Sequence, residues 1–385
     1  MTAILIILSV ILMAVIAVQV GRLAEITSSM QGETEMQTDR NSLHAMLGML
    51  FVGGFLVFCF ASAYYYRTDL FGMPGNIPAS EHGSLIDTLF YITLVPTGIV
   101  FVLTHIALFW FAYKYKGKVG RKVLYIPHDN RLEVIWTAIP AVVMSLLVVG
   151  GLYTWNKVMA DIPENAVAGK DYIEIEATGM QFAWILRSAG KDGLLGTKNF
   201  KLISATNDLG QDWKDVKNHD DVKIDEIVLP VGKQVRVRIT ARDVLHNFYL
   251  PHFRLKMDAV PGMPTYFVFK PIKTTEDRRK ELSLVPEYQE LNKDGKPRWS
   301  AFDYELACAE MCGQGHFSMR KVVKIVTQKE YDEWLNKQKP YYTSNIKGKE
   351  EDTYGKATTK VIEPSVKEGA QSDATKTIVK PLSQR

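Results

Sequence analysis

Four uncharged stretches near the N-terminus constrain this chain more than any other feature of its sequence. They are residues 2–20, 45–66, 88–113 and 134–155, and none contains Asp, Glu, Lys or Arg. A helix that crosses a bilayer needs about 20 predominantly apolar residues. We therefore predict a four-helix membrane anchor followed by a more polar domain.

The loop between the third and fourth stretches predicts the topology, because it is basic. Its positively charged residues are Lys114, Lys116, Lys118, Arg121, Lys122 and Arg131. Loops rich in Lys and Arg stay in the cytoplasm, so the C-terminal domain and Met1 are both predicted to lie outside it. Composition alone also permits residues 2–20 to be a cleaved signal peptide. Cleavage would leave three spans and place the C-terminal domain in the cytoplasm, so we predict that the first helix is retained.

The residues after 170 follow a two-residue period that is typical of β-strands. Residues 171–177 and 234–240 alternate apolar with charged side chains, and residues 266–269 and 322–326 are further strand candidates. Short strands separated by Gly and Pro turns indicate a β-sandwich or a Greek-key barrel. A short helix is predicted near 328–338.

Three polar segments interrupt or follow these strands. Residues 187–222 and 272–300 are predicted to be insertions in the β domain, and the tail at 345–385 is predicted to be disordered because it has few aromatic residues. The net charge of +4 is small for 385 residues, and the basic residues form no stripe. We therefore expect no nucleic-acid partner.

The run from Cys308 to Met319 carries the strongest chemical signal. Its twelve residues include two thiols, an imidazole and a thioether, from Cys308, Cys312, His316 and Met319. Soft sulfur ligands with imidazole select copper, or zinc in a tetrahedral site. A mononuclear blue-copper site uses one Cys, whereas two thiolates can bridge two copper ions, and such a pair needs a second imidazole. His246, which follows the most regular predicted strand, is the natural candidate.

Other interpretations of these residues stay open from the sequence alone. A disulfide between Cys308 and Cys312 would close a loop too small to stabilise much. A tetrahedral zinc site could use both cysteines with His316 and His246. His252 is a further candidate ligand, but its position directly after a proline predicts an exposed surface histidine.

Between roughly residues 88 and 338, the sequence resembles cytochrome c oxidase subunit II. The family's binuclear CuA signature is similar to the run Cys308-x-Glu310-x-Cys312-x3-His316-x2-Met319, preceded by Asp243-Val244-Leu245-His246. Residues 132–140 resemble the start of the family's second anchor helix. Residues 256–262 resemble the loop that follows its first copper ligand.

The resemblance implies a role for each residue of the signature. Two copper ions would be bound by the side chains of His246, Cys308, Cys312, His316 and Met319 and by the backbone carbonyl of Glu310. The Glu310 carboxylate would face a magnesium or manganese ion shared with the catalytic subunit. Glu133 resembles the family's glutamate at the mouth of a proton channel, although a carboxylate at a helix N-terminus also favours the helix dipole.

The resemblance also implies an architecture and a set of partners. It divides the chain into an extra membrane hairpin at 1–67, the family's own hairpin at 88–157 and a periplasmic cupredoxin domain at 170–340. That domain would accept electrons from a c-type cytochrome and pass them to haem in catalytic subunit I. With subunit III, the complex would reduce oxygen to water and translocate protons across a bacterial inner membrane.

The chain departs from the family at one aromatic position. The family has Gln-Trp-x-Trp on an early strand, and its first Trp receives electrons from cytochrome c, whereas this chain has Gln181-Phe182-Ala183-Trp184. Phe182 and Trp184 are therefore the predicted electron-transfer side chains. We expect the donor to be a dedicated c-type cytochrome, held in a supercomplex with a quinol-oxidising complex.

Two other functions would use the same copper ligands. The chain could be the CuA subunit of a nitric oxide reductase, or a membrane-tethered copper carrier without enzyme partners. The copper carrier would leave Glu133 and Glu310 without a role. Quinol oxidase subunits lack the copper cysteines, and nitrous oxide reductase lacks this anchor hairpin, so the sequence argues against both.

Overall fold

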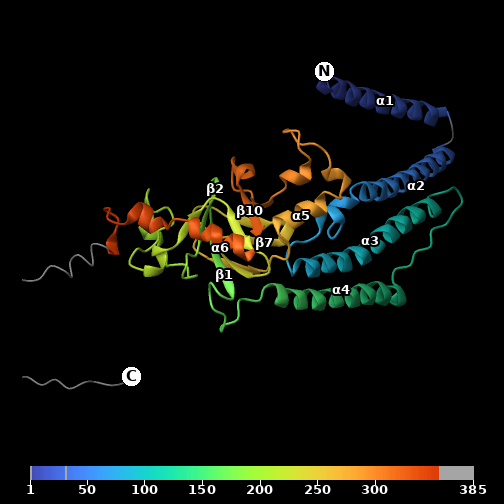
Figure 1. The fold of residues 1–385 in the computed structure, drawn as a ribbon. Helices are drawn as coiled ribbons and strands as arrows, with labels where there is room; N and C mark the ends of the chain where they lie inside the picture. Colours follow the sequence, from blue (N-terminus) through green and yellow to red (C-terminus); the bar gives the residue numbers. More distant parts are fainter. Residues whose placement is uncertain (1, 31–32, 355–385) are drawn as a thin grey trace, which may run out of the picture.

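Four long helices and a β domain with two short helices make up most of residues 2–30 and 33–354, the part of the chain that this computed structural model describes (Figure 1). The helices are α1 (Thr2–Met30), α2 (Glu33–Tyr65), α3 (Gly83–Lys114), α4 (Asn130–Val158), α5 (Thr275–Leu282) and α6 (Gln328–Lys337). The strands are β1 (Tyr172–Met180), β2 (Ala183–Ser188), β3 (Val222–Ile224), β4 (Ile227–Pro230), β5 (Gln234–Ala241), β6 (His246–Leu250), β7 (Leu255–Ala259), β8 (Thr265–Phe269), β9 (Tyr304–Cys308) and β10 (Arg320–Val326).

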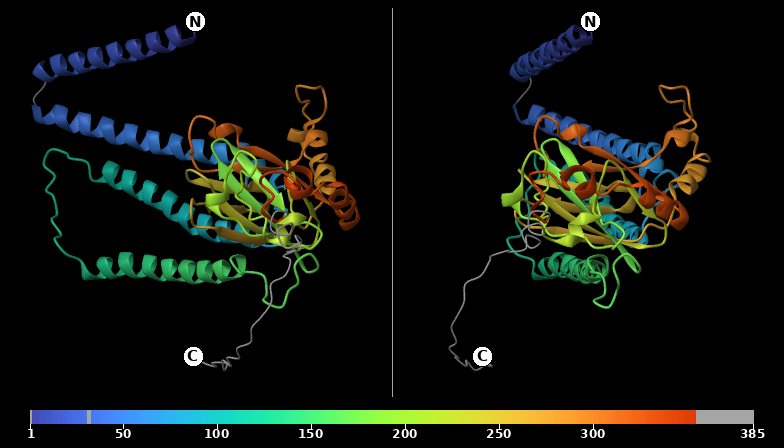
Figure 2. Two further views of the ribbon diagram at one scale, coloured as in Figure 1. Left: turned by 90° about the vertical axis from the view of Figure 1, so that its left-hand side faces the viewer. Right: turned by 60° about the vertical axis from the view of Figure 1, so that its left-hand side comes forward.

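Three of the four long helices, within the described residues, are long and apolar enough to cross a membrane. They are α2 from Met36 to Tyr65, α3 and α4. The first predicted segment is helical as α1, and its crossing of the membrane stays a prediction. The helices α2, α3 and α4 extend from the same end of the β domain, whereas α1 joins α2 at the end that is far from that domain (Figure 2). The helix α2 packs beside α3.

The last of these helices begins earlier than its hydropathy predicts. The fourth uncharged stretch starts at residue 134, whereas α4 starts at Asn130. The side chain of Asp129 accepts hydrogen bonds from the backbone N–H groups of Arg131 and Leu132 and so caps the helix. The helix therefore extends through a polar turn that a hydropathy window leaves out.

Two five-stranded sheets form the β domain, with strand orders β3-β2-β1-β5-β8 and β4-β10-β9-β6-β7. The four strands and the helix predicted after residue 170 are present as β1, β5, β8, β10 and α6. The alternation in β5 places Val235, Val237 and Ile239 at 0% exposure in the core, while the residues between them are more exposed. The prediction of an all-β domain behind a helical anchor is confirmed.

A buried arginine fastens the 187–222 segment to the β domain. Arg187 at the end of β2 forms ion pairs with Glu176 of β1, at 2.8 Å, and with Asp221, at 2.9 Å. It also donates to the side chain of Asn218 and to the carbonyl of Gly196. Because an unpaired buried charge is strongly destabilising, these contacts hold the segment against the sheet.

The packed part of the chain extends past the predicted start of the tail at residue 345. A π-helical turn at Tyr342–Ile346 buries both of its end residues against Trp213. It lies at the end of the β domain farthest from the long helices (Figure 1). The rest of the predicted tail, from residue 355, lies outside the described residues.

The β domain is joined to α3 by a second buried arginine. Arg254, in the turn between β6 and β7, donates to both carboxylate oxygens of Asp87 in the first turns of α3, at 2.7 and 3.1 Å. It also donates to the backbone and side-chain oxygens of Asn76, and its guanidinium lies 4.4 Å from the ring centre of Phe71. The turn that follows β6 is thereby fixed relative to the membrane helices.

Candidate metal centre

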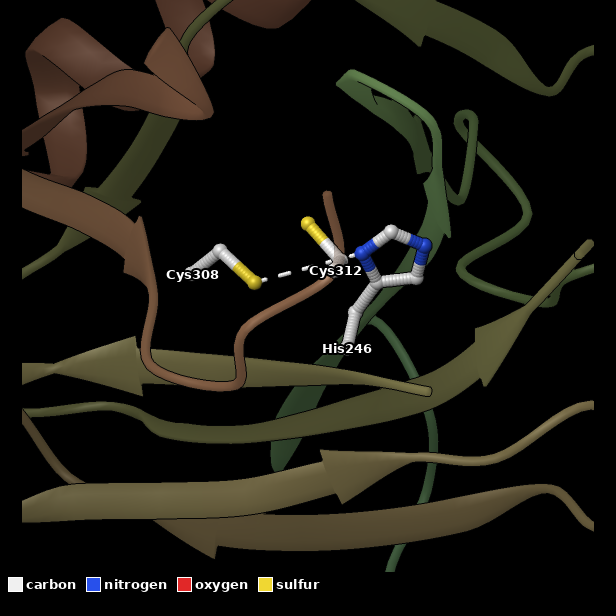
Figure 3. A group of neighbouring side chains, drawn as sticks. All are labelled: His246, Cys308 and Cys312. Atoms are coloured by element: carbon white, nitrogen blue, oxygen red, sulfur yellow. Dashed lines mark hydrogen bonds between the residues drawn. The ribbon is translucent and has the colours of Figure 1, made fainter. Parts of the chain in front are cut away.

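Two neighbouring strands bring the first two predicted ligands together. His246 is the first residue of β6, and Cys308 is the last residue of β9. These strands pair antiparallel, with Phe248 opposite Cys308. The Nδ1 atom of His246 lies 3.9 Å from Sγ of Cys308 (Figure 3). The loop after β9 carries Cys312 back to them, so that one ligand atom from each of the three residues lies within 4.8 Å of the others.

The other three predicted ligands contact the two thiols. The Sγ atom of Cys312 lies 3.6 Å from Nδ1 of His316 and 3.4 Å from Sδ of Met319. The Sγ atom of Cys308 lies 3.2 Å from the backbone oxygen of Glu310. The structure therefore brings all six predicted copper-binding residues into one cluster, with each thiol in contact with an imidazole and with a further donor.

Three of the residues in this cluster are buried from solvent. His246 and Met319 are 0% and 1% exposed, and Cys312 is 6% exposed. Burial, together with the neighbouring Cys308 thiol, raises the pKa of Cys312 to about 11. A metal that bound here would therefore have to displace a thiol proton, and its affinity would rise with pH.

Asp243 orients the buried imidazole. Its Oδ1 atom lies 2.9 Å from Nε2 of His246, which leaves Nδ1 to face Cys308. Burial opposes ionisation of Asp243, but hydrogen bonds from the N–H of Gln181, the His246 ring and the N–H of Val244 hold its pKa below the ordinary value. A carboxylate behind a metal-binding histidine fixes its tautomer and raises its basicity.

Gln181 links this carboxylate to the loop at residues 309–319, which we call the metal loop. Its backbone N–H donates to Oδ2 of Asp243 at 2.7 Å, and its side-chain amide donates to the carbonyl of Cys312 at 2.6 Å. Sequence reasoning missed the roles of both residues. An acid three residues before a ligand histidine could have indicated Asp243, whereas Gln181 is 62 residues from Asp243 and gives no local signal.

The two predicted electron-transfer side chains both lie beside residues of the cluster or of its loop. Trp184 is 3% exposed, and its ring centre lies 6.1 Å from that of His246. Phe182 is 38% exposed and packs on the metal loop, where a Cβ at Gly313 or Gly315 would come within 2.9 or 2.4 Å of its ring. Only glycine at these two positions lets the ring lie this close.

The prediction that His252 is an exposed surface histidine is wrong. Its ring centre lies 5.1 Å from that of Phe302 and 5.7 Å from that of Tyr304. Burial, reinforced by Arg278 and Arg254, lowers the pKa of His252 to about 4. The residue is a neutral packed side chain, and it is not among the residues of the metal-binding group.

The two remaining predicted carboxylates lie apart from the thiols. The Glu310 side chain is exposed on the metal loop. Glu133, in the first turn of α4, lines an open cavity of about 580 Å³ with Asn130 and Thr137, and its carboxylate lies 3.8 Å from Nδ1 of His128. Their roles toward a shared magnesium ion and a proton channel stay predictions.

The donor set fits copper better than zinc. A tetrahedral zinc site would use four donors, the two thiols and the two imidazoles. It would leave the buried thioether of Met319 and the carbonyl of Glu310 without a function, although each contacts a thiol. Two thiols, two imidazoles, one thioether and one carbonyl are the donors that two copper ions sharing both thiolates would use.

We expect Asp243→Ala to lower metal affinity about 10- to 100-fold, because the His246 ring would lose the acceptor that orients it. The fold should survive, since Asp243 lies in a surface turn. The measurement is copper retained in equilibrium with a competing chelator. Asp225→Ala is the matched control, because that carboxylate is fully exposed. Equal affinity of both variants would contradict the orienting role.

Comparisons with known proteins find one family over the anchor and over part of the β domain. The family described as cytochrome c oxidase subunit II, periplasmic domain, matches residues 173–273, and its transmembrane domain matches residues 79–153. An alternative cytochrome c oxidase subunit 2 from Bradyrhizobium diazoefficiens is 32% identical over 69% of this chain and 84% of its own length. A cytochrome c oxidase subunit 2 from Thermostichus vulcanus is 26% identical over 70% and 79%.

A solved structure of the periplasmic domain of cytochrome oxidase subunit II from Bradyrhizobium japonicum is 25% identical, covers 44% of this chain and 95% of its own, and has a TM-score of 0.27. The length and identity of the Bradyrhizobium diazoefficiens match are sufficient to assign the family. The chain belongs to the cytochrome c oxidase subunit II family, as a membrane protein with a periplasmic domain that assembles with other subunits into a haem–copper oxidase, an oxidoreductase complex.

Proposed function

We propose that this chain holds a binuclear copper centre through which electrons reach the oxidase. The observation that carries the proposal is the convergence of four further donors on two thiols that lie side by side. His246, Cys308, Cys312, His316 and Met319 would bind the metals through side chains, and Glu310 through its carbonyl. When bound, such a pair accepts and releases one electron while sharing it between two metals.

The protein's part in this chemistry is to hold the donors in fixed positions and to keep them buried from solvent. β6 and β9 fix the first histidine and the first cysteine by their pairing. Asp243 holds the His246 ring, and Gln181 holds the loop at Cys312. Because the donors are positioned before a metal binds, little geometry has to change when charge is gained or lost.

Electrons would reach the centre through the aromatic side chains around it. Phe182 is the exposed ring on the metal loop, and Trp184 is the buried ring beside His246. The donor would be a c-type cytochrome, held in a supercomplex with a quinol-oxidising complex. This donor is favoured because Phe182 stands where the family has the tryptophan that accepts electrons from soluble cytochrome c.

The exposed carboxylate of Glu310 would bind a magnesium or manganese ion shared with catalytic subunit I, and subunit III would complete the core. The basic 114–122 loop supports a cytoplasmic position for the α3–α4 connection and for Glu133 at a proton-channel mouth. With α1 as a fourth span, both termini would be periplasmic. No observation favours a nitric oxide reductase subunit or a free copper carrier, so we propose neither.

Metal analysis of the purified full-length chain, separated from the haem-bearing subunit, tests the copper proposal. We expect two copper ions per chain, because both thiols have an imidazole and a further donor beside them. The same preparation with Cys308→Ala should lose both ions, since neither could be bridged. One zinc ion per chain would instead support the tetrahedral site and would refute the proposal.

Oxygen consumption by the purified oxidase tests the donor. We expect slow turnover with soluble mitochondrial-type cytochrome c, and fast turnover when a membrane-bound c-type cytochrome copurifies. Phe182→Trp should raise the rate with the soluble donor, because it restores the aromatic side chain that the family uses. Fast turnover of the unmodified enzyme with soluble cytochrome c, and no copurifying cytochrome, would contradict the dedicated donor.

A further inference from the structure

A groove lies between α2 and α3. It is located where the N-terminal half of α2 packs beside the C-terminal end of α3, next to the basic loop at residues 114–122. It has a volume of about 340 Å³, and eight residues line it: Asn41, His44, Ala45, Gly48, Phe109, Ala112, Lys116 and Gly117. The helix α2 lies outside the residues that match the family's transmembrane domain, 79–153. The groove is therefore formed partly by a helix that the matched domain does not include.

The floor of this groove is apolar and narrow. Ala45 and Gly48 of α2 face Phe109 and Ala112 of α3. A Cβ at Gly48 would come within 3.2 Å of the Phe109 ring, so the two helices approach closely here. Because Ala45, Gly48 and Ala112 are small, the space that they line between the helices is left open to an acyl chain.

The rim of the groove is polar and cationic. Lys116 is half-buried, and its ammonium nitrogen lies 4.3 Å from the ring centre of Tyr113. The side-chain amide of Asn41 donates to the carbonyl of Gly117 at 3.3 Å, and the N–H of Val119 donates to Oγ1 of Thr38 at 3.3 Å. These bonds hold the start of the loop over the end of α2, so that the Lys116 ammonium group stays at the groove.

The charge around the rim selects an anion. Residues 114–122 contain five Lys and Arg residues and no Asp or Glu, while Asp39 and Arg40 of α2 offset each other. The ring of Tyr113 lies beneath Lys116, and the ring of Tyr115 lies beneath Lys114. Tyrosines are enriched at membrane–water interfaces, so these two rings place the rim of the groove at such an interface. Basic pockets between membrane helices on the cytoplasmic side bind the headgroups of anionic lipids.

We propose that an anionic phospholipid binds in this groove, with its phosphate at Lys116 and His44 and an acyl chain between Ala45 and Ala112. The inference rests on the cytoplasmic position of the 114–122 loop proposed above. It is independent of the copper centre, so copper content and lipid binding can fail separately.

The test is photo-crosslinking in the purified oxidase complex, reconstituted in phosphatidylcholine vesicles that contain a photoactivatable phosphatidylglycerol. We expect crosslinks on peptides that contain Ala45 or Ala112. Lys116→Gln should reduce them at least about tenfold, because it removes a charge-assisted hydrogen bond to the phosphate. Lys118→Gln is the matched control, because it removes the same charge from the same loop at a residue that does not line the groove. It should reduce crosslinking no more than about fivefold, the effect of removing one cation close to a membrane surface.

Three outcomes would overturn the proposal. A photoactivatable phosphatidylcholine that labels the same peptides equally well would show that the headgroup charge is not recognised. Equal losses in Lys116→Gln and Lys118→Gln would show diffuse attraction to the loop rather than a site. Displacement of the lipid by inorganic phosphate, but not by chloride at the same ionic strength, would assign the rim to a free anion.

Ala112→Leu, which fills the slot with an apolar side chain, should remove the crosslinks while the haem spectrum of the complex stays unchanged.

Discussion

Cys308→Ser is expected to abolish electron transfer from the cytochrome donor to the haems of the oxidase. Cys308 has a central position in the site, because its Sγ atom contacts both the His246 ring and the Glu310 carbonyl. A serine hydroxyl is a hard donor that is not ionised near neutral pH, so it cannot replace a bridging thiolate. Donor-driven oxygen consumption should fall at least about 100-fold, because even the loss of a residue that only orients a metal ligand costs about 10- to 100-fold in activity.

A second cysteine in the same chain supplies the control. Cys59 lies in α2 and is not among the residues of the metal-binding group, and Cys59→Ser exchanges the same atoms. We expect its oxygen consumption to match that of the unmodified complex. A reductant that delivers electrons directly to the haems should still drive the Cys308→Ser enzyme. If it does not, the substitution has damaged assembly rather than electron transfer, and Cys308→Ala in the assembled complex becomes the deciding variant.

Arg254→Met is expected to lower the free energy of unfolding of the β domain by about 3–5 kcal/mol, because it leaves one partner of a buried ion pair uncompensated. This ion pair joins the β domain to the membrane helix α3. Arg254 and Asp87 have side chains only 4% and 7% exposed. The substitution would leave the Asp87 carboxylate buried without a cation and would remove two hydrogen bonds to Asn76. The measurement is the urea concentration at which the visible absorbance of the copper centre is half lost.

Two comparisons make this result specific. Arg298→Met breaks an ion pair with Glu290 whose side chains are 50% and 71% exposed, so it should cost less than about 1 kcal/mol. The double variant Arg254→Met/Asp87→Leu should recover much of the loss, because it removes the orphaned charge. Equal urea midpoints for Arg254→Met and Arg298→Met would contradict the role assigned to the buried pair.

Features that depend on short sequence spacings could be predicted from the sequence. The alternation in β5 indicated a strand with one buried face, and Val235, Val237 and Ile239 are buried as expected. The cysteines and the ligands after them lie within twelve residues, so the loop that holds them was predictable from donor chemistry. His246 could be added because a binuclear site needs a second imidazole.

Features that join distant residues could not be predicted. The Arg254–Asp87 pair links positions 167 residues apart, and nothing local to either residue names the other. The burial of His252 comes from aromatic rings more than 45 residues further along the chain, in and before β9. Its proline neighbour correctly indicates a turn but carries no information about what packs on that turn.

Electron paramagnetic resonance of the purified full-length chain, oxidised and free of the haem-bearing subunit, tests the central claim most directly. Two copper ions that share Cys308 and Cys312 should give a mixed-valence signal in which one unpaired electron is spread equally over both metals. Cys59→Ser should leave this signal unchanged, and Cys308→Ser should remove it. The signal of a single isolated copper ion, or a chain that holds zinc and gives no signal, would contradict the account.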